Sequence, residues 1–307
     1  MLRYALLRVL GAIPTLLLVI VLAFLMVHAA PGGPFQDPRG LPPETLKALQ
    51  EAYGLDQPLL VQLWRYLSHV VRGDFGPSYH YVGYSVGELI RGTLPVSLLL
   101  GTLAILLAVL AGVACGTLAA LRRNSALDRL LMGIAMTGIS IPVFVVAPVL
   151  VLVFAVKLHW LPAGWSGSEG LARLVLPVIA LALPQIAYIA RLTRAGMIEV
   201  LGSDYIRTAR AQGLGTAAIV RYHAFRPALV PVLSYLGPAI AAILTGAVVI
   251  EEVFGIPGLG ELFVRAAGNR DYMVVLGVVV LYAVLVVALN LAVDILYGVI
   301  DPRVRGR

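Results

Sequence analysis

Charged residues are scarce in this sequence, and cysteine is almost absent. Only 13% of the 307 residues are charged and 60% are apolar, whereas soluble domains average about 25% and about 45–50%. The mean hydropathy of +0.93 is correspondingly high. One water-soluble core cannot bury so much apolar side chain, so we expect an all-α polytopic membrane protein whose surface largely faces lipid. The single cysteine, Cys115, excludes an intrachain disulfide.

The motifs of ATP and metal chemistry are also missing. The chain has no Gly-x-x-x-x-Gly-Lys-Ser/Thr phosphate loop, no His-Glu-x-x-His pair and no cluster of cysteines and histidines. We therefore expect no cofactor in this chain, and energy from ATP must come through a partner. The string Gly164-Trp165-Ser166-Gly167 is similar to the serine motif of rhomboid proteases. That chemistry needs a histidine base on a neighbouring helix, and turn residues explain the string better, so we do not expect an enzyme.

Uncharged apolar runs long enough to cross a membrane occur six times. A helix needs about 20 apolar residues to span the hydrocarbon core. Internal prolines, such as Pro142 and Pro184, predict kinks, which neighbouring helices can accommodate. We expect the first run to be an uncleaved span rather than a signal peptide. The predicted spans are Val9–Ala30, Thr93–Leu121, Leu130–Val156, Leu174–Ala190, Pro227–Ile250 and Tyr272–Val293.

Lysine and arginine are distributed unevenly among the connections between these spans. With the N-terminus inside, the inner segments hold 14 of the 23 basic residues and only four acids. The outer segments hold nine basic residues and eleven acids. Because cytoplasmic segments carry an excess of positive charge, we predict that both termini are cytoplasmic. The net charge of +7 lies in the gaps between apolar runs, not on a folded basic face, so we expect no nucleic-acid partner.

The first outer connection, residues 31–92, is too long and too aromatic for a simple linker. Structureless loops of this length are uncommon in compact proteins, so we predict a small helical cap. Pro42-Pro43-Glu44 can open a helix that runs to about Tyr53 and closes at Gly54. Pro58 can open a second helix, whose apolar residues are Val61, Leu63, Trp64 and Leu67.

The inner connection between the fourth and fifth spans has the pattern of two short basic helices. Ser203 or Asp204 can cap a helix that runs through Gln212, and Gly213 supplies a left-handed stop. A second short helix should start near Thr216 and be halted by Pro227.

This inner pair of helices would be exposed to the cytosol. Small residues, Ala209 and Ala211 beside Gly213, would leave a low surface on which another protein can pack closely. The alternative is an amphipathic hairpin on the membrane surface that binds anionic lipid.

The inner segment resembles the cytoplasmic coupling loop of ABC importer permeases in the dipeptide, oligopeptide and nickel branch. The likeness rests on Arg207 to Gly213, followed by His223-Ala224-Phe225-Arg226 and Pro231. Arg207 stands where the general motif has glutamate, and Pro227 stands where asparagine is expected. Strings similar to this branch recur along almost the whole chain: Gly54-Leu55-Asp56-Gln57-Pro58, Gly73-Asp74-Phe75-Gly76-Pro77-Ser78, Glu251 to Gly260, Asp271-Tyr272, Asn290 to Asp294 and Asp301-Pro302-Arg303.

This resemblance implies a permease subunit of the plasma (inner) membrane with four kinds of contact. They are a homologous second permease, two cytoplasmic ATPases, which hold ATP and Mg²⁺, an extracytoplasmic substrate-binding protein, and membrane lipid. The resemblance implies that the ATPase-coupling residues are Asp204, Tyr205, Arg207, Thr208, Ala209, Arg210, Ala211, Gln212, Gly213 and Leu214. Exposed charges of the outer segment would help to seat the binding protein: Asp56, Arg65, Arg72 and Asp74.

Three divisions of the chain follow, with two questions left open. Residues 1–30 form the N-terminus and first span, residues 31–92 the extracytoplasmic segment, and residues 93–307 the permease core with its coupling loop at 198–226. A secondary transporter driven by an ion gradient is the functional alternative, although Asp294 is the one clear buried acid that it could use. Peptide is the expected substrate, with nickel or another small solute as the alternative.

Overall fold

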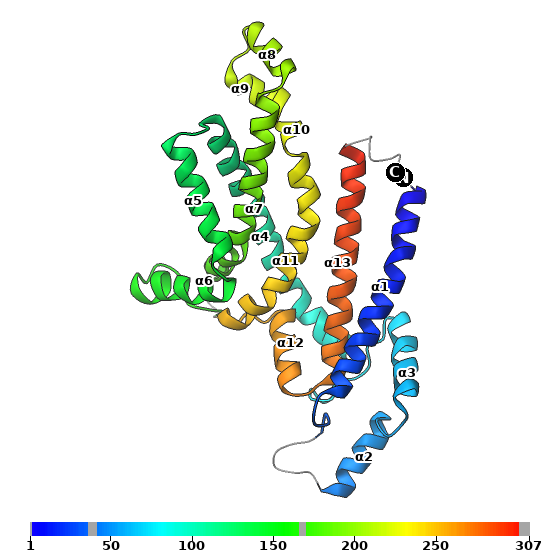
Figure 1. The fold of residues 1–307 in the computed structure, drawn as a ribbon. Coiled ribbons are helices and arrows are strands. Elements are labelled where there is room, and N and C mark those ends of the chain that lie inside the picture. Colours follow the sequence, from blue (N-terminus) through cyan, green and yellow to red (C-terminus); the bar gives the residue numbers. More distant parts are fainter. Residues whose placement is uncertain (1, 36–41, 166–169, 301–307) are drawn as a thin grey trace. The chain divides into compact units, whose positions relative to one another are not determined.

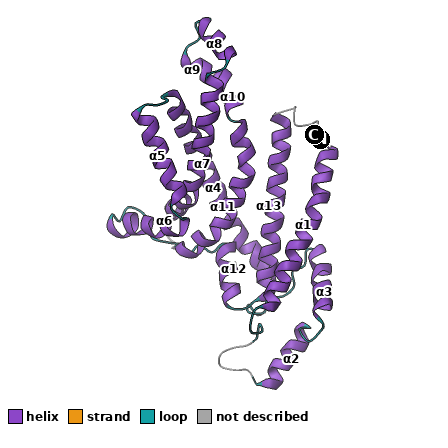
Figure 2. Cartoon of the chain, in the orientation of Figure 1, coloured by secondary structure: helices purple, strands orange, loops and turns teal. Residues whose placement is uncertain are grey.

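The computed structural model describes residues 2–35, 42–165 and 170–300. Within these residues the regular structure is helical throughout, and the extended backbone is limited to an isolated antiparallel bridge between Pro77 and Ser85. Figure 2 shows the helices joined by short loops. The all-α prediction is therefore confirmed.

Among the residues that the structure describes, five helices are long and apolar enough to cross a membrane. They are α1 (Leu2–Ala29), α4 (Val86–Leu121), α7 (Val175–Leu201, preceded by the 3₁₀ turn η2, Gly170–Leu174), α11 (Val230–Phe254) and α13 (Tyr272–Ile300). A sixth candidate is a bent pair: α5 (Ala126–Ser140), then α6 (Val143–Leu150) with its π-helical extension η1 (Val151–Lys157). Figure 1 shows α6 turned sharply away from α5. The prediction of six spans is thus met if this pair counts as one.

The bend between α5 and α6 replaces the single uninterrupted run predicted over Leu130–Val156. The two helices meet at 107°. The break falls at Pro142, where a kink was predicted, because a residue that precedes proline avoids helical backbone. Ile141 is accordingly extended, with φ −96° and ψ 121°. By contrast, α7 continues through Pro184 and α11 through Pro238.

The chain forms two compact units, each of which is described by itself. The first comprises Leu98–Ile256 and the end of the chain from Leu289, and the second comprises Leu2–Ser97 and Pro257–Ala288. The short helices of the first unit are α8 (Asp204–Ala211), α9 (Thr216–Ile219), the π turn η3 (Val220–Ala224) and α10 (Phe225–Ala228). Those of the second unit are α2 (Pro43–Tyr53), α3 (Leu59–Val71) and α12 (Leu259–Gly268).

In the first unit, small residues allow α4 to pack closely against α7. They recur every four residues on one face of α4, at Ala104, Ala108, Gly112, Gly116 and Ala120. A Cβ at Gly116 would lie 2.4 Å from the carbonyl oxygen of Ala190, and one at Gly112 would lie 2.8 Å from the Cβ of Ile189. Glycines with this spacing bring membrane helices into backbone contact. The sequence analysis did not detect this row.

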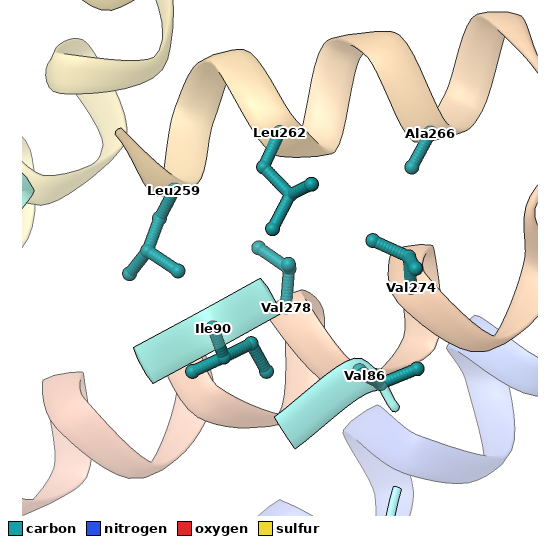
Figure 3. Close-up of a cluster of buried hydrophobic side chains, with 7 residues drawn as sticks. All are labelled: Val86, Ile90, Leu259, Leu262, Ala266, Val274 and Val278. Atoms are coloured by element: carbon teal, nitrogen blue, oxygen red, sulfur yellow. The ribbon is translucent and has the colours of Figure 1, made fainter. Parts of the chain in front are cut away.

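In the second unit, α12 lies over the first turns of α4 and α13. Their contact is a buried cluster, and Figure 3 shows side chains from the three helices pointing toward one another: Val86, Ile90, Leu259, Leu262, Ala266, Val274 and Val278. The buried hydroxyl of Ser97 accepts a hydrogen bond of 2.8 Å from the backbone N–H of Leu259, which satisfies one free donor at the start of α12.

The predicted helical cap is present in this second unit. The helix α2 begins at Pro43 and ends before Gly54, whose φ of 65° is the left-handed stop that was expected. The helix α3 follows Pro58. Of its predicted apolar residues, Leu63 and Leu67 pack against a cluster of α1 and α13 residues, whereas Val61 and Trp64 are exposed.

Candidate functional site

The inner connection predicted to contact an ATPase folds as two short helices. Figure 1 shows α8 and α9 beyond the ends of α7 and α10, at one end of the first unit. Ser203 precedes α8, but its side chain does not cap the helix, so this part of the prediction of a cap by Ser203 or Asp204 is wrong. The Ser203 hydroxyl instead donates a hydrogen bond of 2.6 Å to the carbonyl of Val200. An exposed ion pair of 3.2 Å between Asp204 and Arg207 spans the first turn, where exposed pairs add little stability.

The stop at Gly213 is confirmed in detail. Its φ is +87°, a left-handed conformation that glycine adopts without steric strain. The backbone N–H of Leu214 donates to the carbonyl of Ala209 and that of Gly213 donates to Arg210, at 3.2 Å and 2.9 Å. This pair of bonds is a Schellman motif. No atom lies within 4 Å of the place where a Gly213 Cβ would stand, so that position is open to solvent.

The underside of α8 is fixed to the membrane helices by a buried cluster. Ile206 and Ala209 of α8 pack in it with residues of α4, α7, α9, η3 and α10: Ala120, Met197, Ile219, Ala224 and Ala228. The opposite face of α8 stays open. A force applied to α8 is therefore transmitted to the ends of α4, α7 and α10 at once, because packed interiors deform little.

Nine of the ten predicted coupling residues are on the surface, and Ala209 is not. The exposed residues are Asp204, Tyr205, Arg207, Thr208, Arg210, Ala211, Gln212, Gly213 and Leu214. Ala209 is only 5% exposed, because it faces the cluster under α8. The low surface that was predicted beside Gly213 therefore depends on Ala211, and Ala209 serves to bring α8 close to its support.

The helix that starts at Thr216 does not stop at Pro227 as predicted. Helical backbone continues through η3 and α10 to Ala228. Proline normally disrupts a helix because its ring clashes with the carbonyl four residues earlier. Here that residue, His223, lies in the wider π turn, which moves the carbonyl out of register and makes room for the ring.

An ion pair that the sequence analysis missed joins the start of α5 to α7. The Arg194 guanidinium donates two hydrogen bonds to Asp128, of 2.7 Å and 2.8 Å. The Asp128 carboxylate also accepts from the N–H of Asn124, and Ser125 caps the helix by accepting from the N–H of Asp128. The side chain of Asp128 is 4% exposed. This bidentate pair holds the connection before α5 against the same helix that carries α8.

In the second unit, a buried carboxylate organises the outer segment. Asp271 is fully buried at the start of α13. It accepts hydrogen bonds from the Ser78 hydroxyl and from the backbone N–H groups of Tyr79, His80 and Val274. Four donors compensate the burial of this charge and fix residues 78–80 over the start of α13. The sequence analysis noted Asp271-Tyr272 only as part of a resemblance. One sequence cannot reveal that residues 78–80, which lie 191 to 193 positions earlier, are the partners of Asp271.

The four charges predicted to seat a binding protein are all exposed, and two of them share a cavity. Asp56 and Arg72 lie in the connections before and after α3. Arg65 and Asp74 line a cavity of about 220 Å³, which Phe24 also lines. The arrangement therefore brings one cation and one anion of the predicted set to the same opening.

Both charges at this cavity have neighbours within the chain. Arg65 donates a hydrogen bond of 2.6 Å to the Gln57 side chain. Asp74 receives hydrogen bonds of 2.9 Å from His69 and from the backbone N–H of Gly76. These two bonds, that of His69 first, hold the pKa of Asp74 below its usual value.

Some residues singled out in the sequence lie outside the described part of the chain. They include Ser166 of the protease-like string and the C-terminal Asp301-Pro302-Arg303. For Asp294, the structure describes the backbone of α13 but not the side chain. Its neighbour one turn earlier, Asn290, lies against Gly237 of α11, where a Cβ would come within 2.4 Å of the amide oxygen.

Comparison with known proteins gives consistent matches over the full length. Residues 112–306 match the description "binding-protein-dependent transport system inner membrane component", and residues 1–85 match the N-terminal region of such components. The oligopeptide transport system permease protein OppB of Escherichia coli is 51% identical over 306 residues, which cover 99% of this chain and 100% of that protein. The dipeptide transport system permease protein DppB of Bacillus subtilis is 44% identical, with 99% and 98% covered.

A solved structure has the same fold. A chain of the MetNI methionine ABC transporter, in an inward-facing conformation, superimposes with a TM-score of 0.60. The match covers 69% of this chain and 96% of that chain at 19% sequence identity. At this identity the likeness concerns the fold alone.

Proposed function

This chain belongs to the family of binding-protein-dependent transport system inner membrane components, and we propose that it forms half of the membrane pathway of an ATP-driven peptide importer. The full-length identity of 51% to an oligopeptide permease protein is the observation that carries the proposal. The chain is the membrane subunit and does no covalent chemistry in this scheme. A secondary transporter is not favoured, because the relatives are permease proteins of peptide transport systems and the matched family is that of binding-protein-dependent transport.

The α8–α9 loop is the proposed contact with a cytoplasmic ATPase. Support comes from its geometry: one face of α8 is anchored on the membrane helices α4 and α7 and on the short helix α10, while the other face is exposed. A closing ATPase pair would move α8, and the packed cluster would pass that movement to α4, α7 and α10. Such a rigid-body response is how differential contacts with a partner shift a two-state membrane protein.

The remaining partners and the orientation complete the proposal. A homologous second permease would supply the other half of the pathway, and ATP with Mg²⁺ would be held by two ATPase subunits. Both termini would then be cytoplasmic, so that α8 faces the ATPases and the outer segment faces an extracytoplasmic binding protein. That protein would be seated by four charges of the outer segment, and their exposure supports this proposal: Asp56, Arg65, Arg72 and Asp74.

Reconstitution tests the proposal directly. The chain would be co-purified with its second permease and ATPases, placed in liposomes, and supplied with peptide-loaded binding protein. We expect uptake of labelled peptide that requires both ATP and the binding protein. Uptake that follows an imposed ion gradient without ATP would instead establish the secondary-transporter alternative and refute the proposal.

A further inference from the structure

The helix α3 has a wider apolar surface than the chain itself covers. One side packs against a cluster that contains Tyr66 of α3, Ile20 and Phe24 of α1, and Leu276 and Val280 of α13. Beside this contact lie Leu60, Trp64 and Val71, which are 80%, 74% and 87% exposed. Their spacing of four and seven residues places them on one stripe of the helix.

Three polar residues of α3 lie away from its contact with α1, whereas Gln62 faces α1. Arg65, Ser68 and His69 form this polar edge, from which Arg65 and His69 line the cavity described above. The stripe formed by Leu60, Trp64 and Val71 thus carries no charge, although every side chain in it is open. Large exposed apolar side chains gathered in this way indicate a surface covered by lipid or protein.

Two contacts fix how α3 lies along α1. His28 and Gln62 are hydrogen-bonded at 3.3 Å, and the rings of Phe24 and Tyr66 are 6.4 Å apart. Moving four residues forward in α3 therefore moves four residues back in α1, so the helices are antiparallel and in register. Val70 continues this register by packing on the cluster that includes Ile20. Figure 1 shows α3 beside the last part of α1.

This register places α3 at membrane depth. The apolar span of α1 is Leu10–Ala29. At 1.5 Å per residue, Phe24 lies about 8 Å and Ile20 about 14 Å along the axis from Ala29. Half of a hydrocarbon core is about 15 Å thick. The helix α3 therefore runs alongside the half of the span that ends at Ala29.

We propose that the stripe Leu60–Trp64–Val71 is embedded in lipid, in the bilayer leaflet at the Ala29 end of α1. The neighbouring surface of α1 favours this occupant over a water-soluble protein, since its large exposed residues in this half of the span are also apolar: Leu22, Leu25 and Met26. A tryptophan near the end of a span is typical of residues that anchor proteins at the membrane interface. The outer segment would then be held in the bilayer as well as by its own hydrogen bonds.

Tryptophan fluorescence can test this surface independently of transport. Trp160→Phe and Trp165→Phe leave Trp64 as the single tryptophan of this chain. The transporter is assembled with partner subunits whose tryptophans are replaced by phenylalanine, and it is reconstituted in vesicles of ordinary or brominated phosphatidylcholine. We expect brominated acyl chains to quench Trp64 roughly twofold, while aqueous acrylamide quenches it weakly. The matched control is Arg65→Trp with Trp64→Phe, which moves the ring by one residue to the polar face at the same depth. There acrylamide should be the stronger quencher.

Each other outcome would overturn the proposal. Strong quenching of Trp64 by acrylamide would place the stripe in water, and quenching by neither agent would place it under a partner protein. If the tryptophan replacements prevent assembly, Leu60→Cys in a Cys115→Ser background can carry a polarity-sensitive fluorophore instead. Lipid contact predicts blue-shifted emission relative to the same label at Asp56→Cys, and equal emission from the two sites would refute it.

Discussion

The α8–α9 loop and the segment around Asp271 use polar residues in opposite ways. In the loop, polar side chains such as Thr208 and Gln212 face solvent on the outer side of α8. Around Asp271, one fully buried carboxylate receives four hydrogen bonds from within the chain. The exposed side chains of α8 are therefore available to another protein, whereas the hydrogen bonds of the Asp271 carboxylate are all made within the chain.

This difference predicts where substitutions change function and where they change folding. Buried groups whose partners are lost cost free energy of unfolding, because their desolvation is no longer compensated. Exposed groups can be replaced with little effect on folding, so a loss of transport there must reflect a lost partner. The four predictions below test that separation, beginning with the largest expected effect.

We expect Gly213→Asp to lower ATP-dependent peptide uptake by roughly tenfold or more while insertion persists, as for a residue at the centre of an interface. A Cβ at Gly213 meets nothing in this chain, so a loss of uptake beyond that caused by backbone strain would indicate a clash with the ATPase. The left-handed φ adds backbone strain of at most about 1–2 kcal/mol, because aspartate tolerates this conformation better than most residues. Uptake in liposomes and the melting temperature would both be measured.

Gly83→Asp is the matched control for that strain. Gly83 has a φ of +84°, and nothing lies within 4 Å of its Cβ position either. The two variants should therefore lose similar stability, but only Gly213→Asp should lose ATPase coupling. Gly213→Asn, which tolerates a left-handed φ, should also fail to couple. Normal uptake by Gly213→Asn would contradict a close contact between this position and the ATPase.

The sequence predicted local features of the chain correctly but missed contacts between distant residues. Turns and helix ends such as Gly54, Pro58 and Gly213 were predicted correctly, because proline and glycine restrict backbone conformation locally. Two contacts between distant residues were missed: the ion pair of Asp128 with Arg194 and the bonds of Asp271. Such pairings depend on how helices meet, which one sequence does not reveal.

Two predictions made from local sequence were wrong because the surrounding structure overrides the usual behaviour of these residues. Pro227 did not end its helix, since the π turn before it makes room for the ring. Ala209 is covered by the cluster under α8, although the sequence placed it on an exposed surface. The bend of 107° after Ser140 was anticipated only as a kink, because hydropathy records the length of an apolar run and not its direction.

Asp271→Asn should destabilise the second unit by about 2 kcal/mol, because hydrogen bonds to a charged acceptor are worth more than those to an amide. The substitution also places an NH₂ group against the donors that now surround the carboxylate. Thermal unfolding in detergent would measure the change. The control is Asp56→Asn, an exposed position where we expect a change within about 0.5 kcal/mol. Equal stabilities of the two variants would contradict the role assigned to Asp271.

Gly116→Ala extends the comparison to a glycine whose Cβ position is occupied by neighbouring atoms, unlike that of Gly213. Its Cβ would lie 2.4 Å from the Ala190 carbonyl oxygen and 2.7 Å from the Cβ of Thr193. Since backbone atoms cannot move aside, we expect destabilisation of about 1–3 kcal/mol. Gly133→Ala, in a helix position with nothing within 4 Å, should gain up to about 1 kcal/mol from helix propensity. Unfolding curves that rank the two variants in the opposite order would exclude close packing of α4 on α7.

The smallest expected effect concerns Asp74, which is exposed yet paired, and so lies between the two extremes. The hydrogen bonds from His69 and Gly76 lower its pKa in the folded state. A lowered pKa stabilises the fold above the unfolded value, near 4, and that contribution disappears as the pH falls through the folded value. Wild type should therefore exceed Asp74→Asn by no more than about 0.5 kcal/mol at neutral pH, given solvent screening. The difference should shrink only below about pH 4.

His69→Gln removes the main cause of the lowered pKa of Asp74. It should therefore move the acid-induced loss of stability toward higher pH. Identical profiles of stability against pH for wild type and His69→Gln would show that His69 does not lower the pKa of this carboxylate.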